Sequence, residues 1–493
     1  MTEATGENEL GYPIKIFLNF DPLLMISSFL SSHTFVMGFL FALVLVAVTI
    51  LLGRVFCGWI CPLGTIHNMV GSAAGSKRGG VISSRWFRFK YYLLFFILAS
   101  SLATAQLAGY ADPLSLLVRS LALSIWPAFE YVIRAIFDGF YYLDIPFVTG
   151  ASEAIYDLLR NTILSFRPVF FLQGSLIGLF FIGILALNLI ERRFWCRYIC
   201  PLGALLGLLS RRPLIGRDIS EGCTACGTCR SVCPGGAIRD KKGEAVPSEC
   251  MVCLECDDIC PAGAVRFRWK YKSPAVPLDI KKRTALAAFA GGIAVVPFLR
   301  ITPAAGGVKT DTRLIRPPGA LPEQGFLSAC IRCGECMKIC ITAGLQPTFL
   351  QAGLEGIWTP YLVPQIGHCE LRCTLCGQVC PTGAIRELTI EEKTETKIGM
   401  AVIDKGRCLP FSFGMECLVC EEVCPTSPKA IWLEEAKVIR RNGKTEVLKQ
   451  PRIDLEKCTG CGICEASCPV AAKPAVYVIS TGETRSEDNR VLL

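Results

Sequence analysis

The segment RFWCRYICPLG, residues 193–203, joins the most apolar part of this chain to its cysteine-rich part. The uncharged run from Val169 to Ile190 precedes it, and regularly spaced cysteines follow it. A second copy, RVFCGWICPLG, occupies residues 54–64 and matches the first at Arg, Cys, Ile, Cys, Pro, Leu and Gly in one frame. The chain therefore contains two copies of a unit in which an apolar helix ends at a Cys-x3-Cys-Pro motif.

The composition predicts that part of the chain lies in a lipid bilayer. Hydrophobic residues make up 52% of the 493 residues and the mean hydropathy is +0.44, which is too apolar for a wholly soluble protein. The net charge of +9 comes from basic residues in loops beside apolar runs, so membrane topology explains it better than nucleic-acid binding. The first residues, MTEATGENELGYP, are acidic and polar and do not predict a cleavable secretory signal.

Three uncharged runs have about the length that a membrane-spanning helix needs: Thr34–Leu52, Tyr91–Leu107 and Val169–Ile190. The loop after the first run, Gly53–Lys90, contains basic residues and no acid. The positive-inside rule places this loop in the cytoplasm and the N-terminus outside. Both Cys-x3-Cys-Pro motifs are then expected at the cytoplasmic side.

The remaining apolar segments are shorter or carry charges. Between the second and third runs, Leu114–Ile125, Ala128–Phe140 and Ala154–Leu164 read as separate helices that lie at the membrane interface or are partly buried. Thr284–Leu299 follows Lys281-Lys282-Arg283 and predicts a fourth span, a signal anchor or a buried helix, of which we favour the span. An Asn442-Gly443 turn predicts a hairpin from Lys437 to Val447.

These patterns predict an integral membrane α-helical core with α+β bacterial-ferredoxin-like domains that bind several [4Fe-4S] clusters. The expected divisions are an N-terminal tail and interfacial segment (1–33), a membrane domain with both repeats (34–205), a cytoplasmic two-cluster domain (206–273), a linker and membrane helix (274–303) and a four-cluster domain outside the cytoplasm (304–493).

The 28 cysteines divide into six groups of four and the two Cys-x3-Cys pairs, which leaves none for a structural disulfide. Two groups in the predicted cytoplasmic domain have the spacing C-x2-C-x2-C-x3-C-P. In two-cluster ferredoxins three close thiolates bind one cubane and the distant fourth binds the other. The predicted ligand sets are therefore Cys223, Cys226, Cys229 and Cys260, and Cys250, Cys253, Cys256 and Cys233. Zinc usually takes two separated pairs of ligands and fits this tandem pattern poorly.

The C-terminal region holds the other four groups: Cys330, Cys333, Cys336 and Cys340; Cys369, Cys373, Cys376 and Cys380; Cys408, Cys417, Cys420 and Cys424; Cys458, Cys461, Cys464 and Cys468. They predict four further clusters, six in all. We expect nested sharing of ligands, first group with fourth and second with third, in preference to sharing between neighbours. Disulfides are the alternative for a domain outside the cytoplasm, and the spacing favours clusters.

The pairs Cys57/Cys61 and Cys196/Cys200 have no standard ferredoxin role. Thiols at i and i+4 share one helix face, and two symmetric copies could bring four thiols together as a seventh iron-sulfur site. A thiol/disulfide pair and ordinary packing cysteines are equally open alternatives.

Three acidic residues are candidates for a quinol or proton site: Asp21, Asp112 and Glu130. Both aspartates belong to Asp-Pro-Leu sequences, where Asp as N-cap and Pro at the first helical position make a good helix start. We favour the capping role for the aspartates. For Glu130, the alternative is a simple surface position.

With these motifs, residues 14–270 resemble the NapH/NosR-type polyferredoxin membrane proteins. Residues 281–493 resemble the NapG/MauM-type ferredoxins, above all at IRPPGALPEQGFLSACIRCGEC, residues 315–336. Three features depart from these families: no span precedes the first Asp-Pro-Leu, Lys282-Arg283 stands in place of a twin arginine, and Ile341 replaces the proline after Cys340.

The resemblance implies a natural fusion of two subunits of a quinol dehydrogenase in the bacterial inner membrane. Its implied partners are the membrane quinone pool and periplasmic cytochrome or reductase subunits in a multi-subunit complex, with no nucleic acid. The alternatives are a quinone-reducing module with a cytosolic donor, and a NosR-type maturation or redox-sensing protein. In this topology about 30 Å of hydrocarbon separates the two groups of clusters.

Overall fold

The structure is a computed structural model. It describes residue 10 and residues 15–75, 84–142, 146–162, 164–165, 168–238, 244–269, 280–300, 312–439, 445–470, 472–486 and 489. The linker around residues 270–279 and the predicted Asn442-Gly443 turn lie outside the described residues.

A helical core contains the two repeats in the same order of elements. In each repeat a one-turn helix leads to an aspartate-capped helix, then to an apolar helix, and then to a π-helical turn with the Cys-x3-Cys-Pro motif and a last helix. The first repeat comprises α1 (Ile16–Asn19), α2 (Pro22–Ser32), η1 (Met37–Phe39), α3 (Leu40–Leu52), η2 (Phe56–Ile60) and α4 (Pro62–Ala73). The second comprises α6 (Ala108–Ala111), α7 (Pro113–Ser120), α10 (Gly174–Ala186), η5 (Leu187–Leu189), η6 (Trp195–Ile199) and α11 (Pro201–Leu209). Between them lie η3 (Ser84–Arg88) and α5 (Phe89–Leu102).

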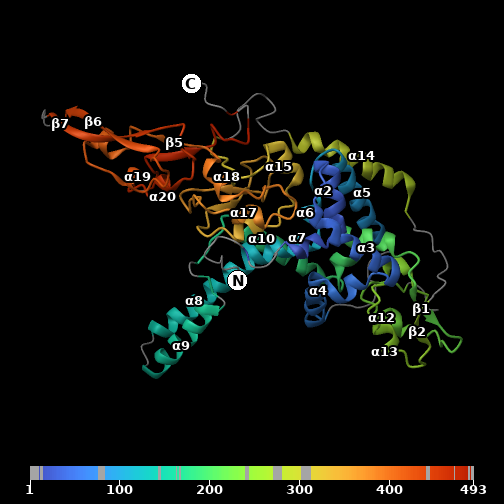
Figure 1. The fold of residues 1–493 in the computed structure, drawn as a ribbon. Coiled ribbons are helices and arrows are strands. Elements are labelled where there is room, and N and C mark those ends of the chain that lie inside the picture. Colours follow the sequence, from blue (N-terminus) through green and yellow to red (C-terminus); the bar gives the residue numbers. More distant parts are fainter. Residues whose placement is uncertain are drawn as a thin grey trace.

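The second repeat contains an insertion, and here the prediction of separate helices is wrong. The segments α7, η4 (Leu121–Ile125) and α8 (Trp126–Tyr142) form one continuous helix of 30 residues. Pro127 lacks an N–H, and the chain accommodates it by a widened π-turn immediately before it rather than by a break. The helix then pairs with α9 (Pro146–Thr162), and this helical hairpin projects away from the core (Figure 1).

Two helices of the described residues are long and apolar enough to cross a membrane, Pro113–Tyr142 and Lys282–Leu299. The three predicted spans do form helices, but these are shorter than predicted: Met37–Leu52, α5 and Gly174–Leu189. The second candidate, α14 (Lys282–Leu299), runs along the core beside α5 (Figure 1). Gly292 allows this packing, because a Cβ there would lie 2.3 Å from the carbonyl oxygen of Phe96.

Three ferredoxin-like units carry the cysteine groups, and an antiparallel pairing closes each. Strand β1 (Ile215–Ile219) pairs with β2 (Val265–Trp269), Ala320 bridges to Ile385, and β5 (Met400–Ile403) pairs with β8 (Val476–Ile479). The predicted hairpin is confirmed by β6 (Ile431–Ile439) and β7 (Thr445–Ile453), and β3 (Leu345–Pro347) pairs with β4 (Pro360–Leu362).

Short helices fill the loops of these units and follow most of the cysteine pairs. They are α12 (Thr228–Val232), η7 (Pro247–Glu249), α13 (Glu255–Asp258), α15 (Glu323–Ala329), α16 (Glu335–Lys338), α17 (Leu375–Gln378), α18 (Ile390–Glu395), η9 (Leu409–Phe413), α19 (Val419–Glu422) and α20 (Ile463–Ala466). Figure 1 shows the first unit on one side of the core and the two C-terminal units extending from the other side, with β6 and β7 at the far tip.

Candidate iron-sulfur sites

The first ferredoxin-like unit forms two sites. Site B is a cavity lined by Cys233, Cys250, Cys253 and Cys256, which is the set that the sequence groups together. Site A consists of Cys223, Cys226 and Cys229, whose thiols interact electrostatically, with Cys260 packed in the same small apolar cluster as Cys229. Site B thus takes its fourth cysteine, Cys233, from the first motif of the unit.

The C-terminal units share ligands between neighbouring motifs, and the predicted nested sharing is wrong. Site D is a cavity lined by Cys330, Cys333, Cys336 and Cys380. Site E is lined by Cys340, Cys369, Cys373 and Cys376. The Ala320–Ile385 bridge explains this pairing, because it encloses the first and second motifs in one unit.

The third and fourth motifs pair in the same way. Site G is a cavity lined by Cys408, Cys417, Cys420 and Cys468. Site F consists of Cys424, Cys458, Cys461 and Cys464, whose thiols interact electrostatically. Strands β5 and β8 flank both motifs and so enclose the third and fourth motifs in one unit.

These cysteine sets fit cubanes better than single ions. All 28 cysteines are free thiols. No group of three His, Cys, Asp or Glu in the described ranges could hold one metal ion, whereas a cubane holds its four thiolates apart by its own width. Burial raises the pKa of Cys250, Cys369 and Cys420 to about 12, so iron would displace a proton from each thiol on binding.

The two repeats bring Cys57, Cys61, Cys196 and Cys200 together as site C. Cys61, Cys196 and Cys200 each interact electrostatically with at least one other thiol of the set. The Cys200 sulfur also accepts a hydrogen bond from the amide of Gly203, 3.2 Å away. The structure therefore makes one four-thiol group from two motifs that lie 139 residues apart, counted from Cys57 to Cys196.

The first arginine of each repeat crosses to the other repeat at site C. Arg54 lies 3.8 Å from the Cys57 sulfur and reaches the start of α11, where a Cβ on Gly203 would lie 2.9 Å from its guanidinium. Arg193 donates to the carbonyl of Cys57 over 3.4 Å. Sequence reasoning missed this role, although the arginine is present in both copies of the motif.

Buried ionic contacts join the core to site B. Glu249, which precedes Cys250, accepts hydrogen bonds from Arg54 (3.3 Å), from Tyr91 (2.9 Å) and from Lys90. All these side chains are buried or nearly so. Glu249 therefore attaches a ligand loop of site B directly to the helices of the core.

A second clamp comes from the other repeat. Arg197 pairs with the buried Glu191 and donates to the carbonyls of Pro234 and Cys233, each over 2.8 Å. One arginine from each repeat therefore holds site B. Of the two sites in this unit, site B is the one next to site C.

The opposite side of the core contacts site D closely. Ile331 and Cys333 belong to the same buried apolar cluster as Cys61 and Cys200. A Cβ on Gly109 would lie 2.0 Å from the carbonyl oxygen of Ile331. The apolar cluster of the core therefore reaches from site C to site D.

Sites D to G continue outward from the core. Sites D and E share one unit, and sites F and G share the next. The amide of Cys369 in site E donates to the carbonyl of Cys461 in site F over 2.8 Å. The seven sites thus follow one another in the order A, B, C, D, E, F and G.

The candidate acids Asp21 and Asp112 are N-caps, as predicted. Each accepts hydrogen bonds from two backbone amides at the start of α2 or α7 and is completely buried. The surface alternative for Glu130 is wrong, because its side chain is 1% exposed and accepts hydrogen bonds from Trp126 and from Ser165.

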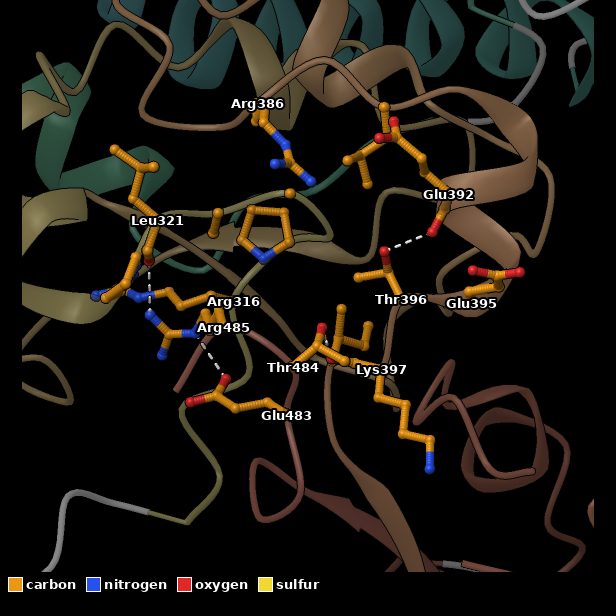
Figure 2. Close-up of a pocket in the computed structure, with 16 residues that line it drawn as sticks. Arg316, Leu321, Arg386, Glu392, Glu395, Thr396, Lys397, Glu483, Thr484 and Arg485 are labelled. Atoms are coloured by element: carbon orange, nitrogen blue, oxygen red, sulfur yellow. Dashed lines mark hydrogen bonds and ion pairs between the residues drawn. The ribbon is translucent and has the colours of Figure 1, made fainter. Parts of the chain in front are cut away.

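A cavity of about 470 Å³ lies in the C-terminal region and has no cysteine in its lining (Figure 2). Arg485 donates there to the carbonyl of Leu321 and to Glu483, and Arg316 pairs with Glu323. Burial alone would raise the pKa of Glu323, but the ion pairs with Arg316 and Arg485 outweigh it and lower this pKa to about 2. The ion pairs of Arg316 and Arg485 with Glu323 join the two C-terminal units.

Three families described by their 4Fe-4S clusters match the chain. A 4Fe-4S binding domain family (Fer4_5) matches residues 34–90, 174–220 and 375–397. A 4Fe-4S dicluster domain family (Fer4_7) matches residues 414–472, and another 4Fe-4S binding domain family (Fer4) matches residues 218–239. The first match covers both Cys-x3-Cys-Pro motifs of site C.

Several curated ferredoxin-type proteins resemble parts of the chain. The ferredoxin-type protein NapG of Escherichia coli (strain K12) is 38% identical over 128 residues, which are 25% of this chain and 52% of NapG. The methylamine utilization ferredoxin-type protein MauM of Paracoccus denitrificans (strain Pd 1222) is 38% identical over 94 residues, 19% of this chain and 41% of MauM. Protein NirI of the same organism is 30% identical over 212 residues, 40% of this chain and 23% of NirI.

The chain spans about half the length, or less, of these relatives, and no solved structure matches it. The matches show a ferredoxin-type electron-transfer protein with several 4Fe-4S domains.

Proposed function

We propose that this protein is a membrane-bound iron-sulfur quinol dehydrogenase that passes electrons singly from the quinol pool to a periplasmic cytochrome or reductase. The observation that supports this most is the unbroken order of seven cysteine sites, from A through the helical core to G. When bound, the clusters supply the one-electron redox chemistry. The protein supplies the ligands, their spacing and the buried surroundings.

Apolar side chains on the outer faces of the core support a membrane location. They are exposed on α3, α10 and α14, where a soluble protein would rarely leave such a continuous apolar surface. They include Leu40, Phe41, Leu43, Val44, Leu176, Leu179, Ile182, Leu286, Phe289 and Phe298.

The helix α14 supports placement of the C-terminal units on the far side of the membrane. At its start, the amide of Lys281 donates to Tyr92. At its end, Arg300 donates to Thr104 and pairs with Glu355 of the C-terminal region. Since α14 has 18 residues, it advances about 27 Å, close to the thickness of the hydrocarbon layer.

Site C would hold a seventh cluster in this scheme. Arg54, Arg193 and Lys90 surround its thiols and would offset the negative charge of a thiolate-bound cubane. The double variant Cys57→Ser, Cys196→Ser is expected to lose the iron of one cluster and its spectroscopic signal. Unchanged iron content and an unchanged spectrum would contradict a cluster at site C.

The overall proposal is tested with purified holoprotein in detergent. Addition of menaquinol or ubiquinol should reduce the clusters, as followed by electron paramagnetic resonance, and an added acceptor should allow turnover. Reduction by a cytosolic electron donor but by neither quinol would instead favour the quinone-reducing direction. A reporter fused after Leu493 tests the side of the membrane, and periplasmic activity is expected.

A further inference from the structure

Two buried aspartates meet where the two repeats meet. Asp21 and Asp112 occupy equivalent positions, each as the N-cap of its helix. One oxygen of each carboxyl is used for capping. Asp21 Oδ1 accepts from the amides of Leu23 and Leu24 at 2.7 and 3.1 Å. Asp112 Oδ2 accepts from the amides of Leu114 and Ser115 at 3.0 and 2.8 Å.

The other oxygen of each carboxyl is not used for capping. Asp21 Oδ2 and Asp112 Oδ1 are buried, and no N–H or O–H of the described residues donates to them. The two side chains nevertheless lie within hydrogen-bonding distance of each other. Two carboxylate oxygens can form such a contact only with a proton between them, because two ionised carboxylates in a low-dielectric interior repel each other.

The pair lies between two of the cysteine sites. Besides Asp21, Asp112 interacts electrostatically with Cys61 of site C and with Arg119 of α7. Arg119 in turn donates to the carbonyl of Arg332 and interacts with Cys333 of site D. The buried aspartate pair is therefore linked to site C through Cys61 and to site D through Arg119.

We propose that Asp21 and Asp112 hold one proton between Asp21 Oδ2 and Asp112 Oδ1, and that the pair takes up a second proton when site C or site D gains an electron. The electron comes from the quinol, and the proton comes from solvent water and binds the remaining carboxylate. Both carboxyls are then neutral, and reoxidation releases the electron and the second proton together. The shared proton is independent of the proposed function, whereas the coupling rests on it because it requires a redox centre beside the pair.

A purely structural capping role predicts different behaviour. Asparagine caps helices about as well as aspartate. Its amide oxygen can accept from the same backbone amides, and its NH2 group can donate to the partner carboxylate. Asp112→Asn therefore keeps the caps and the contact but replaces the shared proton with a permanent donor. Asp21→Asn does the same from the other side and serves if the first variant fails to fold.

The first measurement is infrared spectroscopy of the oxidised holoprotein at pH 7 in H2O and D2O. The wild type should show the C=O band of a protonated carboxyl, shifted by D2O, and Asp112→Asn should lose it. The exposed Asp138 of α8 provides the control variant Asp138→Asn, which should keep the band. An unchanged band in both Asp112→Asn and Asp21→Asn would overturn the shared proton.

The second measurement is a redox titration with dithionite from pH 6 to 8, followed by electron paramagnetic resonance. The reduction potential of one cluster should become more negative as the pH rises. The slope should approach about 59 mV per pH unit, the value for uptake of one proton per electron. Asp112→Asn should flatten this dependence and Asp138→Asn should not. Equal slopes in all three proteins would overturn the coupling. The infrared result stands whether or not quinol is oxidised, so failure of the proposed function is distinguishable from failure of the acid pair.

Discussion

The core contacts its two groups of ferredoxin-like units in different ways. On the site B side the contact is ionic, with Glu249 bound by Arg54, Lys90 and Tyr91 in a buried network. On the site D side the contact depends on close backbone approach at Gly109 and on arginines stacked over aromatic rings. Arg119 lies 4.5 Å from the Trp358 ring and Arg332 lies 4.5 Å from the Tyr110 ring.

The two sides meet the same requirement in different ways. In each case a cluster must lie close to the core while the core stays shielded from water. Buried charges are costly unless they are fully paired, so the ionic contact tolerates very little change of orientation. The contact on the site D side requires matching shapes, because the backbone of Ile331 lies against Gly109. Variants that affect one side and not the other test this distinction.

The largest effect is expected from Glu249→Gln, which leaves Arg54 and Lys90 buried without their carboxylate partner. Loss of one partner of a buried ion pair costs roughly 3–5 kcal/mol. The thermal unfolding midpoint should fall and iron should be lost from site B first. The exposed Glu221 of the same unit supplies the control Glu221→Gln, which should behave as wild type. Equal stability of both variants would show that the network is not needed.

A smaller effect is expected from Gly109→Ala on the site D side. The added Cβ would meet the carbonyl oxygen of Ile331 at 2.0 Å, and such overpacking costs about 1–3 kcal/mol. Proteolysis between the core and the C-terminal units should become faster. Gly139→Ala in α8 is the matched control, because a Cβ there has nothing within 4 Å and should stabilise the helix by about 0.5–1 kcal/mol. A neutral Gly109→Ala would contradict the close contact.

Arg119→Lys should weaken the contact on the site D side less than Gly109→Ala does. Lysine keeps the charge but lacks the flat guanidinium that lies over Trp358, and such stacking contributes about 0.5–2 kcal/mol. Chemical denaturation should show this loss with the spectrum of site B unchanged. A change at site B would mean that the two sides are not independent.

The smallest effect is expected at the ion pairs of Glu323, the first residue of α15. The ion pairs of Glu323 lower its pKa to about 2, below its value in the unfolded chain, so they stabilise the fold above about pH 4.5. This contribution should disappear as the pH falls from about 4.5 to 2. Glu323→Gln should remove that part of the acid dependence and leave both contacts with the core unchanged. Identical acid unfolding curves for variant and wild type would exclude the effect.

Local patterns in the sequence were sufficient for several features. The Asp-Pro-Leu starts predict the caps at Asp21 and Asp112, and the Asn-Gly turn predicts the hairpin of β6 and β7. The tandem spacing also groups Cys233 with Cys250, Cys253 and Cys256. Each of these depends on residues whose chemistry acts within a few positions or within one repeated unit.

Features that join distant segments required the tertiary structure. The cysteine spacing alone does not predict which C-terminal motifs share ligands. The pairings Ala320–Ile385 and β5–β8 determine it, because each encloses two neighbouring motifs in one unit. The predicted helices Leu114–Ile125 and Ala128–Phe140 are continuous, because a π-turn joins them. The approach of site D to site C depends on Gly109 meeting Ile331, a contact between residues 222 positions apart. The sequence by itself determined the ligands and the caps, which are local. Only the packing of the two repeats decided how the seven sites follow one another, and it also brought the carboxyls of Asp21 and Asp112 into contact.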